Sequence, residues 1–388
     1  MVLDWYLHPS VQSSHRSSLW FFPLVSAYAT VIMPLTIYSF MFADGLPGLQ
    51  DRTGHAYEMF FGLGLGLVAG YLLGRQKLYM LLALMGSWML ARVSHLWLPW
   101  SLPALGIQGL FTVLMLSQLV PRLRVAKRWR NRMLVPLLTA LLLLPLAAVT
   151  AAVKTTSWSF HWETAGSSLL LFSLLMSYMG GRAIAPAAAA AHHQRKYELA
   201  ARVQPRIEAW LIIVIGLAAL LLPFVDSWLT GVLSGVAGML VLYRLGRWRL
   251  WPVRRHADLI CMGVGYAWLG LGLLVFGVYQ MLSLPPTAAL HFITVGALGT
   301  LSTGMMARVV LRRTLKVAPP PIGLVLITAS IAFSALARFG ADLDLWLVRD
   351  LWLRLSVVAW STAYAGLTVW LVTALIYGGA SKDKTLKP

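Results

Sequence analysis

The chain has 388 residues, of which 59% are hydrophobic and only 12% are charged. A soluble globular protein carries about 25% charged residues, so this composition argues against a soluble enzyme and against a disordered chain. The formal net charge is +19, and Cys261 is the single cysteine, which excludes an internal disulfide and a cysteine-based zinc site. Long apolar runs separated by basic segments are typical of a multi-pass membrane protein.

Twelve apolar runs are interpreted as bilayer spans, for which a helix needs about 20 mostly apolar residues. In chain order they are 19–42, 56–73, 78–97, 102–120, 133–153, 161–179, 207–222, 228–243, 259–284, 288–309, 322–339 and 352–376. The first run is longer than the apolar region of a signal peptide, so it is interpreted as a retained span. The sequence therefore predicts an all-α fold, a polytopic membrane helix bundle of about twelve transmembrane helices.

The distribution of basic residues tests this span count, because cytoplasmic loops of membrane proteins carry an excess of Lys and Arg. With both termini placed on one side, 26 of the 32 basic residues fall on that side and 6 on the other. This imbalance argues against reading the short runs 207–222 and 228–243 as one re-entrant hairpin. Both termini are therefore predicted to be cytoplasmic. The same topology, together with anionic lipid, accounts for the basic loops, so no nucleic-acid partner is expected.

No soluble domain interrupts the apolar runs, so residues 1–388 are predicted to form a single integral-membrane domain. The basic segment 181–206 is expected to be a cytoplasmic loop that joins two halves of about six spans each, 1–180 and 207–388. The two halves share no convincing sequence repeat, which weakly disfavours a transporter built from pseudo-symmetric halves.

Ionisable side chains at membrane depth are costly and mark candidate functional sites. In the predicted topology four histidines lie near the external membrane face, namely His55, His95, His161 and His291. Neutral imidazole is a common ligand of haem iron, copper and zinc, so these four are candidate metal ligands. The alternative is that each histidine only forms hydrogen bonds at the headgroup boundary. Glu58 follows His55 by three residues, on the same face of a helix.

Four sequence blocks resemble those of the NnrS family of bacterial membrane proteins. They are HAYEMFFGLGLGLVAGYLL at 55–73, GGR at 180–182, GYAWLGLGLLVFG at 265–277 and ALHFITVGALGTLSTGMMARVVL at 289–311. The resemblance extends over nearly the whole chain. It implies a twelve-span protein of the bacterial inner membrane that contains haem and copper. It also implies a role in the response to nitric oxide and nitrosative stress, often in connection with denitrification.

The resemblance also implies which residues form the site. The first motif histidine falls on His55, its acidic partner on Glu58 and the other metal ligand on His291. Arg182 and Arg308 match motif arginines at the cytoplasmic ends of spans. The expected site is therefore a haem or copper site near the periplasmic face, in which His55 and His291 are ligands and Glu58 orients a ligand or is one itself.

Three positions depart from the family pattern, because Tyr57, Gly263 and Arg313 stand where the family has histidines. Tyrosine can ligate ferric haem, so Tyr57 is kept as a candidate cofactor ligand. Glycine and arginine do not replace imidazole. The chain is therefore expected to hold fewer metals than its relatives, or none.

Two other functions fit the same sequence. A transporter or permease would fit the twelve spans and the glycine-rich helix faces, but mid-span carboxylates for ion coupling are essentially absent. A non-catalytic assembly partner of respiratory or denitrification complexes would fit the missing histidines. No P-loop, H-E-x-x-H, G-x-S-x-G or C-x-x-C motif occurs, so no enzymatic activity is assigned. The expected partners are the lipid bilayer, nitric oxide and those complexes.

The topology makes a direct prediction. A reporter protein that is active only in the cytoplasm should be active when it is fused after Pro388, because that terminus lies on the positively charged side. The same reporter fused after Gly48, in the first external loop, should be inactive. A periplasmic location of the C-terminal fusion would contradict the orientation.

Overall fold

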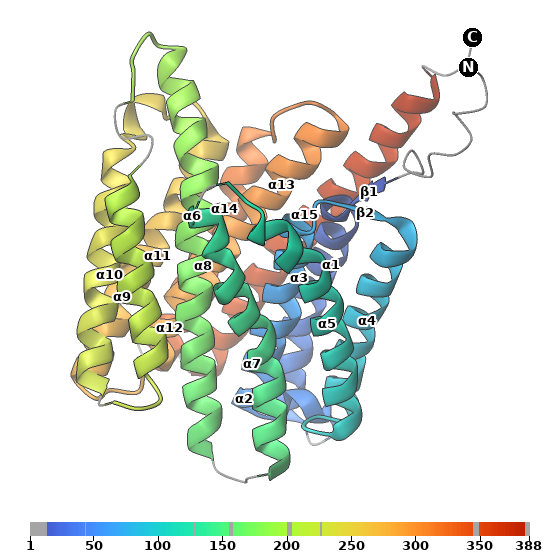
Figure 1. Ribbon diagram of the computed structural model, residues 1–388, viewed down its shortest axis with the longest axis vertical. Helices are drawn as coiled ribbons and strands as arrows, with labels where there is room; N and C mark the ends of the chain where they lie inside the picture. The colour runs from blue at the N-terminus through green and yellow to red at the C-terminus, as the bar shows by residue number, and fades with distance from the viewer. Residues whose placement is uncertain are drawn as a thin grey trace. The chain divides into compact units, whose positions relative to one another are not determined.

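The computed structural model describes residues 14–42, 44–127, 129–154, 158–199, 204–225, 227–343 and 349–384. These residues are helical almost throughout, as Figure 1 shows, which confirms the all-α prediction. Within the described ranges the only strands are β1 (Ser14–Arg16) and β2 (Arg75–Lys77), which pair antiparallel. Nine helices of the described chain are long and apolar enough to cross a membrane.

Each of the twelve predicted spans is helical in the structure. The first six are α1 (Ser17–Met41), the continuous run of α2 (Arg52–Tyr57), η3 (Glu58–Gly64) and α3 (Leu65–Leu72), then α4 (Leu78–Trp97), α5 (Leu102–Arg124), α7 (Leu134–Lys154) and α8 (Trp158–His193). The last six are α9 (Pro205–Leu221), α10 (Ser227–Arg247), α11 (Ala257–Met281), the continuous run of α12 (Thr287–His291), η5 (Phe292–Gly299) and α13 (Thr300–Thr314), then α14 (Pro321–Asp342) and α15 (Arg349–Lys384). Three short elements are η2 (Pro47–Leu49), α6 (Trp129–Arg132) and η4 (Trp251–Val253).

Local sequence signals set several helix ends. Asp51 precedes α2 and its side chain accepts a hydrogen bond from the backbone N–H of Gly54. Ser101 precedes α5 and accepts in the same way from Ala104, at 3.4 Å. Such capping side chains satisfy backbone donors that the first turn of a helix leaves without partners. The chain leaves α3 through Gly74, whose φ of +67° is a backbone conformation that glycine adopts at little cost.

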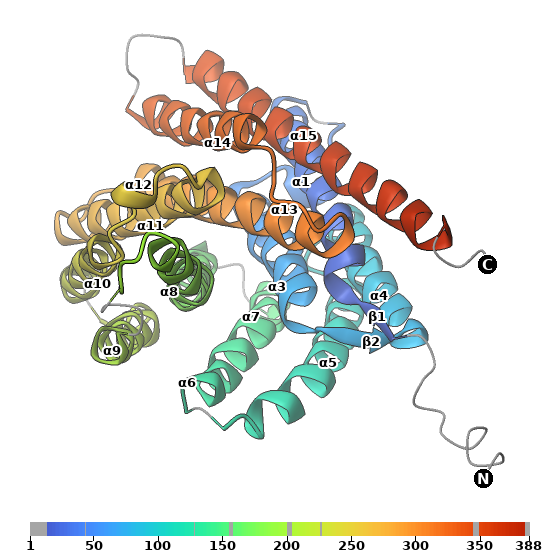
Figure 2. The same cartoon turned by 90° about the horizontal axis from the view of Figure 1, so that it is seen from above.

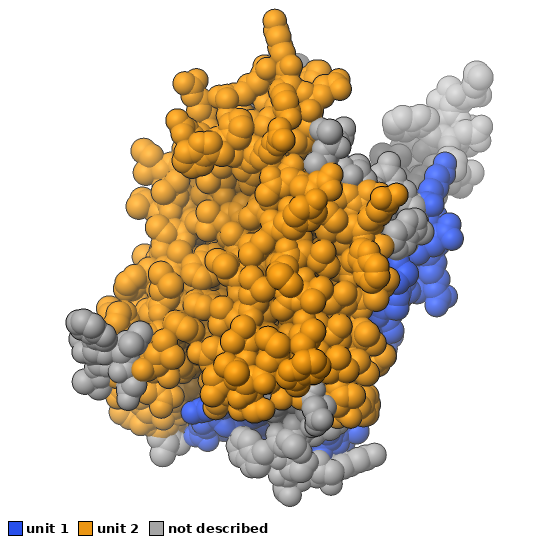
Figure 3. Space-filling view, turned by 90° about the vertical axis from the view of Figure 1, so that its left-hand side faces the viewer, with its two compact units in different colours: residues 1–25, 46–156 blue, residues 26–45, 157–388 orange. Residues whose placement is uncertain are grey.

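The chain folds into two compact units, which are coloured separately in Figure 3. Unit 1 comprises residues 1–25 and 46–156, and unit 2 comprises residues 26–45 and 157–388. Segment 181–206 therefore belongs to unit 2, and its first part is not a loop, because α8 continues as a helix to His193. The single membrane domain with halves 1–180 and 207–388 stays a prediction.

Helices that follow one another in the chain lie side by side within each unit. In unit 1, α5 packs between α4 and α7. In unit 2, α10 packs between α9 and α11, and α14 lies along α15, as the view from above in Figure 2 shows. Short connections produce this arrangement, because a tight turn returns the chain along the helix it has just formed.

Glycines bring α10 and α11 into backbone contact. A Cβ atom added to Gly231 would lie 2.7 Å from the carbonyl oxygen of Gly277, and one added to Gly238 would lie 2.7 Å from that of Gly270. Small residues at a helix interface allow this close approach, which membrane proteins use because apolar side chains gain little by leaving lipid.

We expect Gly277→Ala to destabilise the protein by about 1–3 kcal/mol, because the new methyl group must displace the backbone of α10. Gly216→Ala in α9 is the matched control, since a Cβ atom there meets nothing within 4 Å. Thermal unfolding of the detergent-solubilised protein measures both effects. Equal midpoints for the two variants would contradict the backbone contact.

Candidate functional site

Both motif histidines lie at the start of a π-helical segment. His55 lies three residues before Glu58, where the π-helical segment η3 begins. His291 directly precedes Phe292, where the π-helical segment η5 begins. π-helical turns are rare and frequently occur at functional sites, because the wider turn changes the direction of the side chains that follow. The two segments therefore mark the same two spans that carry the motif histidines.

A buried network of four polar side chains surrounds the acidic motif residue in unit 1. Arg92 of α4 donates through Nη1 to Oε2 of Glu58 at 3.1 Å and through Nη2 to Oε1 of Gln108 in α5. The Nδ1 atom of His95, one turn after Arg92, lies 2.7 Å from the other carboxylate oxygen. Glu58 is fully buried, and the other three side chains are at most 3% exposed. We call these four residues the Glu58 network.

Charge balance explains why the Glu58 network is tolerated inside an apolar bundle. A carboxylate removed from water is costly unless a countercharge and hydrogen-bond donors meet it. Arg92 supplies the countercharge, and Gln108 accepts from the second Nη atom of the same guanidinium. The network thereby fixes the positions of three spans relative to one another near one end of unit 1.

Aromatic rings cover the histidine of this network. The ring of Tyr57 stacks on that of His95 with centroids 4.0 Å apart and an interplanar angle of 18°. Trp100 meets His95 edge-on at 5.0 Å. The guanidinium of Arg92 lies 5.5 Å from the centroid of Tyr57. A phenol ring thus packs against His95 at the position where the family pattern has a second motif histidine.

Two histidines have the orientation of metal ligands. The Nδ1 atom of His95 lies against the Glu58 carboxylate, and Nδ1 of His291 lies 2.6 Å from the carbonyl oxygen of Thr287. Carboxylate and carbonyl oxygens only accept, so in the neutral rings Nδ1 carries the hydrogen and Nε2 carries the lone pair. Metal-ligating histidines are usually oriented by such a bond at the other ring nitrogen. Both ring nitrogens of His95 are buried and neither meets hydrogen-bond geometry among the described residues, so the 2.7 Å approach of Glu58 to Nδ1 is a contact of charge and distance.

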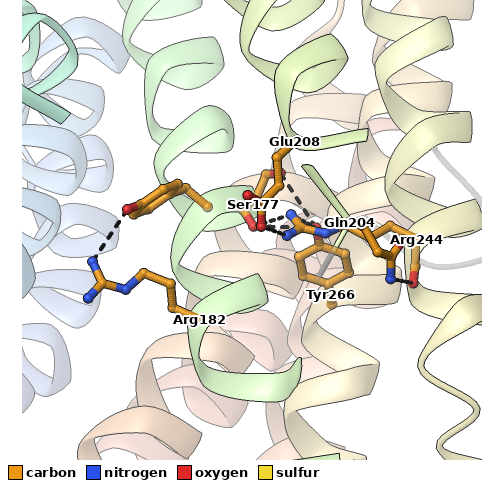
Figure 4. Close-up of polar contacts among 7 residues, drawn as sticks. Ser177, Arg182, Gln204, Glu208, Arg244 and Tyr266 are labelled. Atoms are coloured by element: carbon orange, nitrogen blue, oxygen red, sulfur yellow. Dashed lines mark hydrogen bonds and ion pairs between the residues drawn. The ribbon is translucent and has the colours of Figure 1, made fainter. Parts of the chain in front are cut away.

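A second buried cluster lies in unit 2 and joins four helices (Figure 4). Arg244 of α10 is 2% exposed, and its Nη1 donates to the carbonyl oxygen of Ser177 at 3.2 Å and to the hydroxyl of Tyr266 at 3.3 Å. Its Nη2 forms an ion pair with Glu208 of α9. The side-chain amide of Gln204 donates to the carbonyl oxygen of Arg244 at 3.4 Å. We call these residues the Arg244 cluster.

The Arg244 cluster explains the glycines of the G-G-R block. A Cβ atom at Gly180 would lie 2.6 Å from the ring of Tyr266, and one at Gly181 would collide with the guanidinium of Arg244. Only glycine therefore fits at both positions without a shift of these side chains. Tyr266 itself belongs to the G-Y-A-W block, so two separate sequence blocks meet around one buried arginine.

The sequence blocks described above belong to a pattern that extends along the chain. The profile of the family described as NnrS protein matches residues 13–377, nearly the whole chain. The chain belongs to the NnrS family. No curated protein and no solved structure matches the chain. Membership, together with the nine apolar helices of the described chain, establishes a multi-pass membrane protein.

The motif arginines of this NnrS protein have different surroundings. Arg308 of α13 forms an ion pair of 2.9 Å with Asp258 at the start of α11. Arg182 is exposed on α8, and its contact is a hydrogen bond of 3.4 Å to the hydroxyl of Tyr178, on the side away from Arg244 in Figure 4. Arg308 therefore connects two helices, whereas Arg182 contacts its own helix.

The three positions where the NnrS pattern has histidines are occupied in different ways. Tyr57 is buried against His95, and Arg313 is exposed on α13. At Gly263 an added Cβ atom would meet the terminal methyl group of Leu250, so a side chain there requires that leucine to shift. The family histidines have thus been replaced by side chains that fit their new surroundings.

The remaining candidates are placed as follows. His55 is half-buried in unit 1, on the same span as Glu58, whereas His291 belongs to unit 2. His161 lies in α8, and its side chain is outside the described residues. Over the described ranges, no group of three or more His, Cys, Asp and Glu side chains converges as a metal site would require. The pairing of His55 with His291 therefore stays a prediction.

Sequence reasoning missed the roles of Gln108 and Arg244. Gln108 lies inside the apolar run 102–120, and a lone amide in such a run is a signal of a buried polar contact. Arg244 directly follows the run 228–243, where the predicted topology has a loop, although it is buried. Helix length alone could have signalled this, since a 16-residue run is short for a span.

Replacing Arg92 by methionine should destabilise the protein by about 3–5 kcal/mol, because the Glu58 carboxylate would stay buried without a countercharge. The double variant Glu58→Gln with Arg92→Met should recover part of this loss. Arg52→Met, at an exposed position of the same unit, is the control. Chemical or thermal unfolding in detergent gives the comparison, and additive effects of the two substitutions would contradict a direct ion pair.

Proposed function

We propose that this NnrS protein binds haem in the bacterial inner membrane and acts in the response to nitric oxide. The observation that carries the proposal is the orientation of His95 and His291, each of which has an acceptor oxygen within 2.7 Å of Nδ1, an arrangement that favours a lone pair at Nε2. These two side chains are the ones in the described chain best suited to ligate iron. When bound, haem would supply an iron centre for a diatomic ligand such as nitric oxide.

The donor set fits haem better than copper. Haem iron takes its four equatorial ligands from the porphyrin and needs one or two side chains, whereas protein copper sites are usually built from three or more donors. The described residues contain no cluster of three such donors. Single histidines held in a fixed tautomer therefore match the requirement of haem.

The residues around His95 would each contribute to such a site. Glu58 would orient the imidazole, and Arg92 balances the charge of the carboxylate. Tyr57 and Trp100 cover the ring and exclude water from it. Around His291, the wider π-helical turn begins at the next residue and alters the spacing of the helix backbone.

A specific observation favours a second candidate function. Gly263, Tyr57 and Arg313 stand where the family pattern has histidines, and Leu250 occupies the space beside Gly263. A protein that has lost these ligands would instead act as a non-catalytic partner of respiratory or denitrification complexes. The absence of bound haem in folded protein, together with co-purification of such a complex, would favour this alternative. A permease has less support, because the buried carboxylate Glu58 is already neutralised by Arg92.

The protein purified from haem-producing cells should show a Soret band that shifts when nitric oxide is added. His95→Ala and His291→Ala should each weaken or shift this band, because each removes a proposed ligand. His193→Ala, at an exposed position in unit 2, should leave it unchanged. Size-exclusion chromatography shows which variants are folded. A folded wild-type protein that has no haem would sink the proposal.

A further inference from the structure

The two short strands form a ribbon with one basic face. β1 pairs antiparallel with β2, so that Arg16 lies opposite Arg75 and Ser14 opposite Lys77. Side chains alternate between the two faces of a strand. Gln76 points inward and is 3% exposed, whereas Arg16, Arg75 and Lys77 are exposed. Three cations therefore share the outward face of a ribbon only three residues long.

Among the described residues of unit 1, no acidic side chain lies next to this face. No Asp or Glu occurs between Glu58 and Glu163. The described acidic residues of unit 1 are Asp51 and Glu58, at the far end of the helical run that leads to β2. The exposed residues Arg122, Arg124 and Lys127 at the end of α5 add further positive charge to the unit. Charge complementarity therefore points to an anionic partner.

The pairing of Arg16 with Arg75 is itself unfavourable without a counterion. Side chains directly opposite each other in an antiparallel pair have Cβ atoms about 5 Å apart, and like charges at that distance destabilise the pair. An anion bound between the two guanidinium groups would remove this repulsion. Guanidinium groups bind phosphate oxygens with two parallel hydrogen bonds, so a phosphate group is the anion that fits.

The ribbon is held firmly by contacts beneath it. The hydroxyl of Ser17 donates to the carbonyl oxygen of Gly74 at 3.1 Å, and the backbone N–H of Ser17 donates to the same oxygen at 2.9 Å. Arg122 donates to the carbonyl oxygens of Leu73 and Arg75. The turn before β2 is thus anchored to the start of α1 and to α5, and the basic side chains of the ribbon begin from a fixed backbone.

The ribbon also lies where lipid headgroups are expected. β1 leads directly into α1 and β2 directly into α4, so both strands lie at the ends of membrane helices. Trp20 is 38% exposed and Tyr79 is 65% exposed, and aromatic side chains of this kind gather at the membrane–water interface. The predicted topology places this end on the cytoplasmic side, where anionic lipids attract basic segments.

We propose that the outward face of the β1–β2 ribbon binds the phosphate group of an anionic phospholipid of the cytoplasmic leaflet, through Arg16, Arg75 and Lys77. The site is independent of haem and lies in unit 1, away from the Glu58 network. If basic segments were only attracted to the membrane in general, all of them would contribute alike. A specific site predicts that this ribbon binds the lipid more tightly than the other basic segments do.

Native mass spectrometry of the delipidated full-length protein in detergent tests the proposal. Phosphatidylglycerol should bind more tightly than phosphatidylcholine. The triple variant Arg16→Gln, Arg75→Gln and Lys77→Gln should weaken phosphatidylglycerol binding at least about tenfold, since each basic residue near an anionic headgroup contributes roughly fivefold. The matched control removes three exposed cations of unit 2 by Arg247→Gln, Arg255→Gln and Lys316→Gln, and should retain binding.

A second variant guards against misfolding of the triple variant. Arg16→Glu creates an opposite-charge cross-strand pair with Arg75, so it should keep or raise the unfolding temperature while it abolishes lipid binding. Equal loss in the test and control variants, or no loss in either, would overturn the proposal. Displacement of the lipid by the same concentration of inorganic phosphate would also overturn it, because the site would then take the soluble ion.

Discussion

The ion pair between Glu58 and Arg92 is the constraint on which the arrangement of the candidate site depends. In an apolar interior the carboxylate cannot remain ionised unless its countercharge is held beside it, so the spans that carry the two residues have little freedom to move apart. The same carboxylate lies at Nδ1 of His95 and fixes which ring nitrogen carries the lone pair. Gln108 completes the arrangement by accepting from the guanidinium. One buried charge therefore sets the positions of three helices and the chemistry of one imidazole.

Unit 2 also contains a buried charged side chain that is balanced by an opposite charge on a neighbouring helix. Arg244 is buried and meets Glu208, Tyr266 and a backbone carbonyl, and the space for its guanidinium exists because Gly181 has no side chain. The G-G-R and G-Y-A-W blocks thus have a packing role, although they were first noticed as family motifs. By contrast, His291 has a hydrogen bond to Thr287 of its own helix, and a π-helical turn begins at the next residue. A motif histidine oriented in this way is the better candidate for ligand binding.

The sequence predicted the fold well and the site only in part. Runs of apolar residues determine helices in lipid almost alone, because every backbone group must be satisfied within its own segment. All twelve runs are accordingly helical. The π-helical turns left no signal, because they depend on packing between helices. The sequence suggested Glu58 as the acidic partner of His55, which stays a prediction, but it did not reveal the contacts of Glu58 with Arg92 and His95 on another span. Which polar residues meet across spans is decided by helix rotation, and hydropathy does not reveal it.

The described basic residues of this chain include buried cations that are paired with carboxylates and exposed cations that are not. The net charge of +19 does not distinguish the two groups. Arg92 and Arg244 are buried, and each is balanced by a carboxylate, so they contribute nothing to the field outside the protein. Arg16 and Arg75 are exposed and face each other across a strand pair. Positive-inside topology predicts such residues on the cytoplasmic side but does not predict that two of them are opposite each other. That placement costs stability in the absence of an anion, so topology alone does not explain it.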